Sequence, residues 1–272
     1  MTARSYKTEP LQVTDTDPME DFERLDITLL GKTKRVYKTG TGPAVIIMAE
    51  MPGIYVHVLR FVRMVRDAGF TVYLPSLFGR DGGPVSKLSG VGTIAKACIS
   101  KEFNAFAANK SSPVTQWLRA LAAHAHAECG GAGVGALGMC FTGNFALSMM
   151  VEPAVKAPVL CQPSLPLGKP GTIDISADEL AVVNKRLEDE DLTVLGYRFE
   201  GDGFCKAARF EALEKALGER FVPRVLPDTA ALPDAPMKPH SVVTLHLIDE
   251  EGEPTRAAVD EILGFFKTRL TA

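Results

Sequence analysis

The sequence predicts an α/β fold, in which a mostly parallel central sheet is covered by helices on both faces. Short apolar runs alternate with longer amphipathic runs along most of the chain, which is typical of such a sheet. The run over residues 44–49 is continuously apolar, as strands that are buried on both faces are. A strand-like run, a glycine-flanked turn around Cys140 and a helix-like run also follow one another over residues 132–150.

Each expected element is identified by its pattern. Strands are short apolar runs bounded by glycine, proline or polar residues, and helices are runs in which apolar residues recur every three or four positions. In chain order, the expected strands are 26–30, 34–37, 44–49, 70–74, 132–137, 158–161, 193–199 and 242–248. The expected helices are 56–68, 94–108, 114–128, 144–150, 179–188, 205–217 and 256–270.

The segments between these elements are expected to be loops. Gly31 and Lys32 join the first two strands as a hairpin, and glycine and proline are frequent over residues 75–92 and 162–174, which favours surface loops there. The polar residues 1–25 are expected to form an irregular N-terminal extension. Residues 26–272 are expected to form a single domain, because this length is ordinary for one α/β domain.

Composition limits the class of protein. With 46% hydrophobic residues and a net charge of −3, the 272-residue chain is expected to be globular and to bind neither nucleic acid nor a membrane surface. The N-terminus lacks the apolar core of a signal peptide, and polar residues and glycine interrupt the apolar region 44–59. Five scattered cysteines without CxxC pairing favour free thiols. We therefore expect a protein of the reducing cytoplasm, without disulfides or a zinc site.

The turn over residues 138–143 is the most informative feature of the chain. It reads Gly-Met-Cys-Phe-Thr-Gly between a strand-like and a helix-like run, which is typical of the nucleophile elbow of α/β-hydrolases. Glycines flank such a turn because a Cβ there would strike the neighbouring strand or helix. The turn aims Cys140 into a cleft at a helix N-terminus, whose dipole favours a thiolate. The pattern predicts the α/β-hydrolase fold with Cys140 as nucleophile, although most cysteines are buried and inert.

A cysteine nucleophile needs a base and an acid that orients the base. Among the histidines, His240 is the candidate base, because it follows a loop late in the chain, where α/β-hydrolases carry theirs; an exposed loop histidine is the plain alternative. His246 is expected inside the last strand, packed against a covering helix. Asp202 is the candidate acid because glycines flank it just after the expected strand 193–199, with Glu200 as the alternative. An aspartate in a glycine turn is also simply a good turn residue.

The end of the run 44–49 carries a further candidate. Glu50 follows this buried run directly, and a carboxylate is costly there unless it has a task or a partner. In this fold, the backbone beyond that strand supplies one N–H group of the oxyanion hole. We assign the two donors to the N–H groups of Met51 and Phe141, which are expected to contribute the largest single term in catalysis.

Taken together, these residues resemble the dienelactone hydrolases, which are cysteine hydrolases of the α/β-hydrolase fold. The resemblance extends from about residue 26 to the C-terminus, and its anchors are residues 45–54, 74–80, 138–143, 202 and 239–242. It implies a catalytic triad of Cys140, Asp202 and His240. It also implies that Glu50 interacts with the thiol before substrate binds, and a buried salt bridge between Glu50 and an arginine such as Arg80 is the alternative.

The chain departs from the pattern of this family at several positions. Thr142 stands where the family elbow has glycine, so a β-branched residue enters the turn. Thr244 stands four residues after the histidine, where the family has an arginine that binds the carboxylate of the substrate. Lys101 is a candidate counterpart of the family's second arginine. The segment 162–174 is also longer than the family minimum. The resemblance therefore implies the fold and the triad, but not a dienelactone substrate.

The sequence thus predicts a hydrolase of carboxylic esters or lactones that forms a thioester acyl-enzyme and needs no metal or organic cofactor. The expected partner is a small-molecule substrate, and the expected assembly is a monomer or a small homo-oligomer. A glutamine-amidotransferase-like fold also has a cysteine elbow, but it expects a glutamate two residues after the histidine, where Val242 stands. A catalytically silent small-molecule binding protein with the same fold is the alternative from another class, and its Cys140 would be unreactive at neutral pH.

Overall fold

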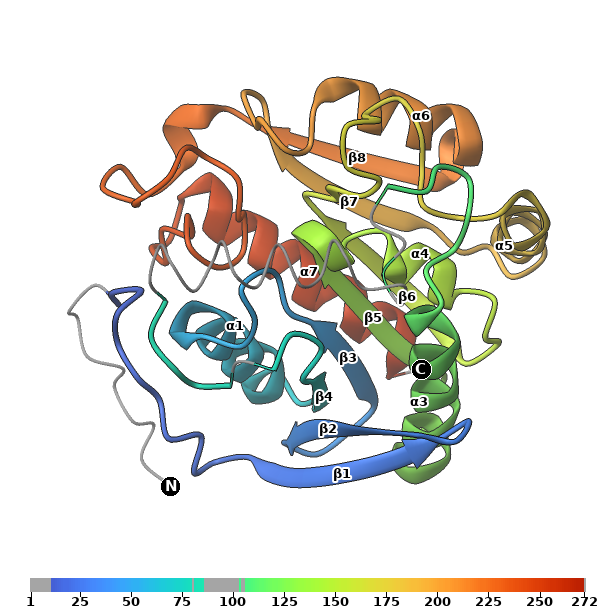
Figure 1. Cartoon of the computed structure of the whole chain (residues 1–272), viewed down its shortest axis with the longest axis horizontal. Helices are drawn as coiled ribbons and strands as arrows, with labels where there is room; N and C mark the ends of the chain where they lie inside the picture. Colours follow the sequence, from blue (N-terminus) through green and yellow to red (C-terminus); the bar gives the residue numbers. More distant parts are fainter. Residues whose placement is uncertain (1–10, 80, 86–102, 104–105, 272) are drawn as a thin grey trace.

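Eight strands form one sheet in the computed structural model, which describes residues 11–79, 81–85, 103 and 106–271 (Figure 1). The strands are β1 (Glu23–Leu29), β2 (Lys32–Thr39), β3 (Ala44–Met48), β4 (Thr71–Pro75), β5 (Val134–Met139), β6 (Val155–Cys161), β7 (Val194–Phe199) and β8 (Phe221–Leu226). Their order across the sheet is β1-β2-β4-β3-β5-β6-β7-β8. Strands β3 to β8 are parallel, whereas β2 is antiparallel to both of its neighbours.

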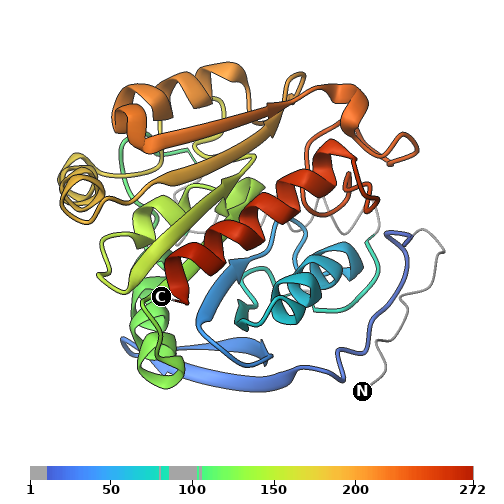
Figure 2. The same cartoon turned by 180° about the vertical axis from the view of Figure 1, so that it is seen from behind.

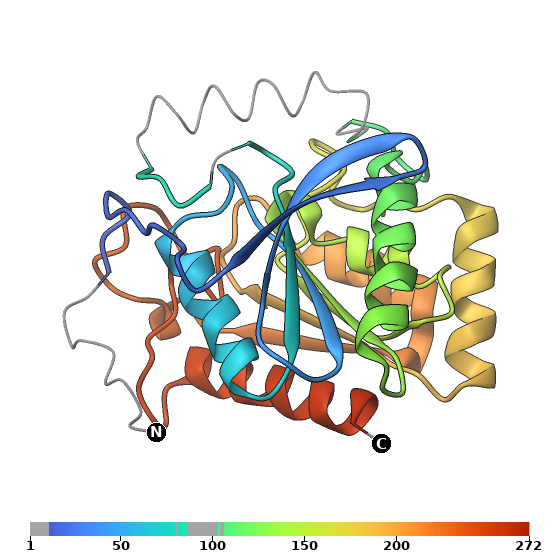
Figure 3. The same ribbon diagram turned by 90° about the horizontal axis from the view of Figure 1, so that it is seen from below.

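Helices cover both faces of this sheet. They are α1 (Val56–Asp67), α3 (Val114–Cys129), α4 (Phe145–Met149), α5 (Ala177–Asp189), α6 (Ala207–Leu217) and α7 (Pro254–Leu270), with short 3-10 turns η1 (Cys140–Thr142), η2 (Gly218–Arg220) and η3 (Asp228–Ala230). Helices α1 and α7 lie across one face (Figure 2), and the view from below separates them from α3 and α5 (Figure 3). None of the described helices has the length and apolar character that crossing a membrane requires.

Alternation along the strands builds an apolar cluster on each face. Successive side chains of a strand point to opposite sides of the sheet. Strand β3 accordingly contributes Ile46 and Met48 to the cluster under α3, α4, α5 and α6, and Val45 and Ile47 to the cluster under α1 and α7. All four side chains are fully buried. The continuous apolar run that predicts this strand therefore reflects burial on both faces.

The sequence predicts most of these elements. Each expected strand from 26–30 to 193–199 overlaps one of the strands β1 to β7, and every expected helix except one overlaps an observed helix. The expected helix over 94–108 lies almost entirely outside the described residues. Before β1, residues 11–22 form turns and irregular chain. Arg63 of α1 forms ion pairs with Asp17 and Asp21 of this segment.

The prediction of a last strand over residues 242–248 is wrong. Residues 242–246 form consecutive turns, and Arg60 of α1 donates hydrogen bonds to the carbonyl groups of Thr244 and Leu247 at 2.8 and 3.4 Å. Val242, Val243 and Leu247 of this run are buried in the apolar cluster that also contains residues of α1 and α7. The eighth strand is instead β8, which contains Pro223; proline is tolerated there because β8 is the edge of the sheet.

Four segments that carry predicted site residues follow the carboxyl ends of strands. Glu50 follows β3, Cys140 follows β5 and Asp202 follows β7, while His240 lies in the long connection between β8 and α7. Because these strands are parallel, their carboxyl ends lie at one edge of the sheet, where ligand sites of α/β proteins form. The fold therefore gathers side chains that are far apart in the sequence.

Candidate active site

The elbow has the strained geometry that its sequence predicts. Cys140 has a φ angle of +52°, a left-handed conformation that is uncommon for a residue other than glycine and that occurs at nucleophile elbows. A Cβ on Gly138 would lie 2.0 Å from the carbonyl oxygen of Thr142, and one on Gly143 would lie 2.5 Å from Cα of Pro163. Both glycines are therefore required by close approach of the backbone.

The loop after β6 anchors the elbow. The carbonyl group of Cys140 accepts hydrogen bonds from the N–H groups of Gly143 and Ser164, at 3.0 and 2.9 Å. The Cys140 side chain is partly exposed, so an incoming reagent is able to reach it. The helix behind it is shorter than expected, since α4 has five residues and the 3-10 turn η1 precedes it. The helix dipole is correspondingly weaker than the sequence implies.

Asp202 and His240 meet although 38 positions separate them in the sequence. Oδ2 of Asp202 lies 2.7 Å from Nδ1 of His240. Oδ1 of Asp202 accepts the backbone N–H groups of Phe204 and Cys205, at 2.8 and 3.0 Å. Both members of the pair are buried, whereas the sequence suggests an exposed turn for Asp202 and a loop position for His240. The aspartate is thus held by two amides and fixes one nitrogen of the ring.

Cys140 interacts electrostatically with the His240 ring. Burial of the ring opposes its protonation, but the charge of the Cys140 sulfur, followed by the contacts with Asp202, outweighs burial and raises the pKa of His240 to about 10. In the part of the chain that the structure describes, the buried Nε2 atom has no hydrogen-bond partner. The sulfur therefore acts on the ring mainly through charge.

His246 supports the backbone that carries His240, a role that the sequence does not reveal. Its Nδ1 accepts the N–H group of Ser241 at 3.1 Å and, more weakly, that of His240 at 3.4 Å. Its Nε2 lies 3.1 Å from the carbonyl oxygen of Met237. Burial lowers the pKa of His246, which keeps Nδ1 available as an acceptor. His246 thus joins two parts of the His240 loop instead of packing from a strand.

Glu50 is surrounded by hydrogen-bond donors. Oε1 accepts the hydroxyl groups of Tyr55, at 2.6 Å, and of Thr244; Oε2 accepts the hydroxyl group of Ser241 at 2.6 Å and the side-chain amide of Gln162 at 3.3 Å. Burial and the neighbouring carboxylate raise the pKa of Tyr55, so that its hydroxyl group keeps its proton. Four donors from three segments of the chain satisfy a carboxylate that would otherwise be costly to bury.

The hydrogen bond between Glu50 and Cys140 that the resemblance implies is not found among the described residues, because both carboxylate oxygens are engaged elsewhere. The alternative partner, Arg80, lies outside the described residues. Ser241 and Thr244 follow His240 by one and four residues, so their hydrogen bonds with Glu50 connect the histidine loop to the end of β3. Its observed contacts are those of a residue that positions this loop.

Of the two predicted substrate-binding positions, the structure describes only Thr244. Thr244 is fully buried, and its hydroxyl group is committed to Glu50, so the prediction that it lines the substrate site is wrong. Lys101 lies outside the described residues.

Replacement of Glu50 by glutamine distinguishes its two possible roles. Loss of charge-assisted hydrogen bonds to the histidine loop is expected to lower the free energy of unfolding by about 1–3 kcal/mol and to lower kcat for an ester by roughly tenfold through loss of orientation. The rate of Cys140 alkylation by iodoacetamide is expected to stay within about twofold of that of the wild type, since alkylation needs no oriented acyl group. Denaturant unfolding and alkylation kinetics measure the two effects.

Glu261→Gln is the matched control, because Glu261 also accepts a tyrosine hydroxyl, at 2.7 Å from Tyr197, but belongs to α7. It is expected to leave kcat unchanged. Faster alkylation of Cys140 in the Glu50 variant, without loss of stability, would contradict the positioning role and support direct control of the thiol.

The two candidate oxyanion donors follow neighbouring strands. Met48 of β3 pairs with Gly138 of β5, and the chain beyond these residues leads to Met51 on one side and to Phe141 on the other. The N–H group of Gly53 donates to the carbonyl group of Glu50 at 2.8 Å, which forms the turn that holds Met51. Met51 is partly exposed, like Cys140. The register therefore brings both candidate amides to the edge of the sheet where the nucleophile lies.

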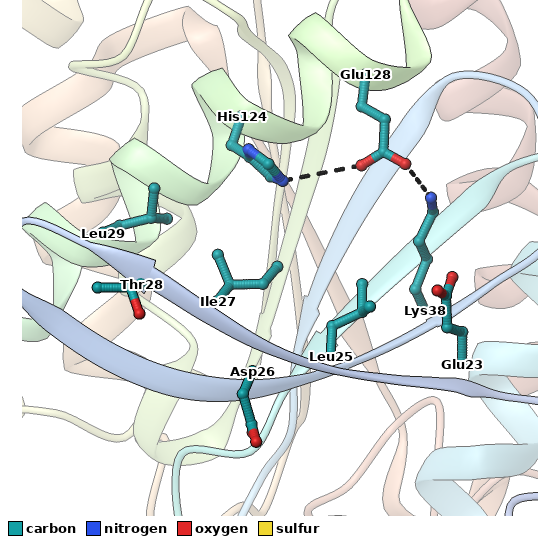
Figure 4. Close-up of a pocket in the computed structure, with 9 residues that line it drawn as sticks. All are labelled: Glu23, Leu25, Asp26, Ile27, Thr28, Leu29, Lys38, His124 and Glu128. Atoms are coloured by element: carbon teal, nitrogen blue, oxygen red, sulfur yellow. Dashed lines mark hydrogen bonds and ion pairs between the residues drawn. The ribbon is translucent and has the colours of Figure 1, made fainter.

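A separate surface groove of about 460 Å³ lies between β1 and α3 (Figure 4). Its polar lining includes Glu128, which pairs with Lys38 and, at 3.8 Å, with His124. Leu25, Ile27 and Leu29 of β1 also line it, and none of the predicted site residues does. Because Lys38 and His124 are paired with Glu128 and no cysteine is among the lining residues, the groove is not a second candidate site for a cysteine nucleophile.

The fold and the site define a class of protein. A mostly parallel sheet with a strained cysteine elbow after β5, an aspartate after β7 and a histidine bonded to that aspartate is the arrangement of an α/β-hydrolase. The family model described as the dienelactone hydrolase family matches residues 28–225. The chain therefore belongs to the dienelactone hydrolase family. His240 lies beyond the matched residues, so its assignment depends on its contact with Asp202.

Solved structures agree with this fold. A candidate dienelactone hydrolase from Klebsiella pneumoniae has a TM-score of 0.61 at 19% identity, over 90% of this chain and 97% of that one. The dienelactone hydrolase from Anabaena variabilis has a TM-score of 0.57 at 14% identity, over 92% and 100% of the two chains. A dienelactone-hydrolase-like promiscuous phosphotriesterase from metagenomic libraries has a TM-score of 0.59 at 16% identity, over 92% and 98%. No curated protein matches the chain. At these identities the likeness establishes the fold.

Proposed function

We propose that the protein hydrolyses carboxylic esters or lactones through Cys140, His240 and Asp202. The observation that carries this proposal is the buried contact of 2.7 Å between Asp202 and His240, beside a cysteine in the strained conformation of an elbow. An aspartate that fixes one ring nitrogen leaves the other nitrogen to exchange protons with the nucleophile and the leaving group. Membership of a hydrolase family supports the same class of reaction.

The proposed reaction has two halves. In the first, the Cys140 sulfur bonds to the carbonyl carbon, the N–H groups of Phe141 and Met51 stabilise the oxyanion, and His240 gives its proton to the departing alkoxide. In the second, His240 takes a proton from water, the resulting hydroxide attacks the thioester, and the thiolate leaves beside the protonated ring. The alcohol leaves in the first half and the acid in the second, and the proton that His240 gives to the alkoxide is replaced by the one that it takes from water.

A screen of p-nitrophenyl esters and lactones, with Cys140→Ala as control, tests this proposal. We expect hydrolysis by the wild-type chain and none above background by the variant. Substrate binding without turnover by the wild-type chain, together with a Cys140 that resists alkylation at neutral pH, would support a silent binding protein instead.

We also expect a preference for uncharged substrates. The family position that would bind a carboxylate is occupied by Thr244, whose hydroxyl group is bonded to Glu50, so this position supplies no cationic side chain. The p-nitrophenyl ester of pentanoic acid is therefore expected to have a kcat/KM about 10- to 100-fold higher than that of glutaric acid, the difference that loss of a bidentate charged contact implies. Equal chain lengths make this a matched pair, and faster turnover of the glutarate ester would contradict the expectation.

A further inference from the structure

Thr142, the residue that replaces a glycine in the elbow, carries an additional inference. Its side chain is fully buried. Its hydroxyl oxygen accepts the N–H group of Met139 at 2.9 Å and donates to the carbonyl group of Met48 at 2.8 Å. The carbonyl groups of Met139 and Ala49 lie farther away, at 3.0 and 3.4 Å. A hydroxyl group has one proton to donate, and the shortest distance assigns that proton to Met48.

These contacts join the ends of two strands. Met48 is the last residue of β3 and Met139 the last residue of β5, and the two strands are parallel neighbours whose final registered pair is Met48 with Gly138. Beyond that pair, the chains diverge into separate turns. The Thr142 hydroxyl group therefore forms a polar link between the strands at the point where their pairing ends.

The link lies next to both candidate oxyanion donors. Phe141 follows Met139 by two residues, and Met51 follows Met48 by three. An oxyanion hole requires both N–H groups to reach one oxygen at about 2.7–3.1 Å, so their mutual spacing matters more than the position of either one. A displacement of about 1 Å is enough to cost about 100-fold in rate. A hydroxyl group that fixes the two strand ends also fixes this spacing.

We propose that Thr142 is a positioning residue that sets the distance between the Phe141 and Met51 amides. The inference rests on the proposed hydrolysis, because only a reaction that passes through an oxyanion uses both amides. It assigns no contact with substrate to Thr142. It also explains why a β-branched residue is accommodated in a turn that elsewhere in the family has glycine: the side chain supplies a hydrogen-bonded link there.

Thr142→Val tests the proposal, because valine keeps the shape of the side chain and removes the hydroxyl group. For a p-nitrophenyl ester, kcat is expected to fall by about 10- to 100-fold with KM within about twofold. Alkylation of Cys140 by iodoacetamide is expected to stay within about twofold, since displacement at a saturated carbon forms no oxyanion. Thr142→Ser, which keeps the hydroxyl group, is expected to retain most of the activity.

Thr115→Val is the matched control, since Thr115 is a buried threonine of α3 whose hydroxyl group donates to the carbonyl group of Ser112 at 2.7 Å. Its kcat is expected to be unchanged. Thr142→Ala serves as a second variant if the valine variant is not recovered folded, with the same expected pattern. Two results would overturn the role of Thr142 if the wild type is active. One is full kcat in Thr142→Val or Thr142→Ala, and the other is an equal fall in kcat and in the rate of Cys140 alkylation. A wild type without ester hydrolysis would instead overturn the proposed function.

Discussion

Limiting iodoacetamide is expected to label Cys140 before any other thiol in the described part of the chain, and Cys140→Ala is expected to lower kcat by a factor on the order of 10⁴. A thiolate is the reactive form of cysteine, and Cys140 is partly exposed and interacts with the His240 ring. Burial raises the pKa of Cys161, with a contribution from Glu50, and burial likewise raises that of Cys205, with a contribution from Asp202. Mass-spectrometric peptide mapping measures the order of labelling.

Cys129 is the informative competitor, because it is partly exposed, as Cys140 is. Its sulfur lies 3.7 Å from the Tyr73 hydroxyl group and has no elbow geometry. Cys129→Ser is therefore expected to leave both turnover and the labelling of Cys140 unchanged. Preferential labelling of Cys129 in the wild type, with Cys140 untouched, would contradict the assignment of the nucleophile.

His240→Ala and Asp202→Asn are each expected to lower kcat by about 10³- to 10⁴-fold. Without His240, alkylation of Cys140 at pH 7 is expected to slow by about tenfold or more, because the ring that interacts with the sulfur is absent. In Asp202→Asn, an NH2 group replaces one carboxylate oxygen. It faces either the backbone N–H donors of Phe204 and Cys205 or the His240 ring, and each arrangement disturbs the orientation of that ring. Steady-state kinetics and alkylation rates measure these effects.

Triad members act as a unit, so the double variant is expected to be little worse than either single variant. Because both side chains are buried, each change is also expected to cost about 1–3 kcal/mol of stability, and the folded fraction has to be measured beside kcat. Independent, multiplicative losses would contradict the triad. Full activity of Asp202→Asn would move the acid to another residue, with Glu200 as the next candidate.

The elbow and the sheet could be predicted because their signals are local. The apolar run of β3 and the glycines at 138 and 143 reflect burial and close approach of backbone that hold wherever the rest of the chain lies. Asp202 and His240 could be predicted from chain order, turn chemistry and the family resemblance. Their burial could not, because it depends on segments that pack over them from elsewhere in the sequence.

The errors arose where tertiary contacts override local pattern. Residues 242–248 have the apolar pattern of a strand, but Arg60 and Glu50 bind their backbone and side chains in a turn. Strand β8 was not predicted. It contains Pro223, and proline is compatible with a strand mainly at the edge of a sheet, where β8 lies. The partners of Glu50 come from three separate segments, so no spacing in the sequence identifies them. Thr142 is visible as a departure from a family pattern, but its link between two strands requires the structure.

Rapid mixing with p-nitrophenyl acetate, followed by acid quench and peptide mass spectrometry, tests the central claim most directly. We expect a burst of one p-nitrophenol per chain and an acetyl group on the peptide that contains Cys140 in the wild type, and neither in Cys140→Ala. Turnover by the wild type with an acetyl group on another residue, or hydrolysis that survives in Cys140→Ala, would contradict catalysis by the Cys140 thiol.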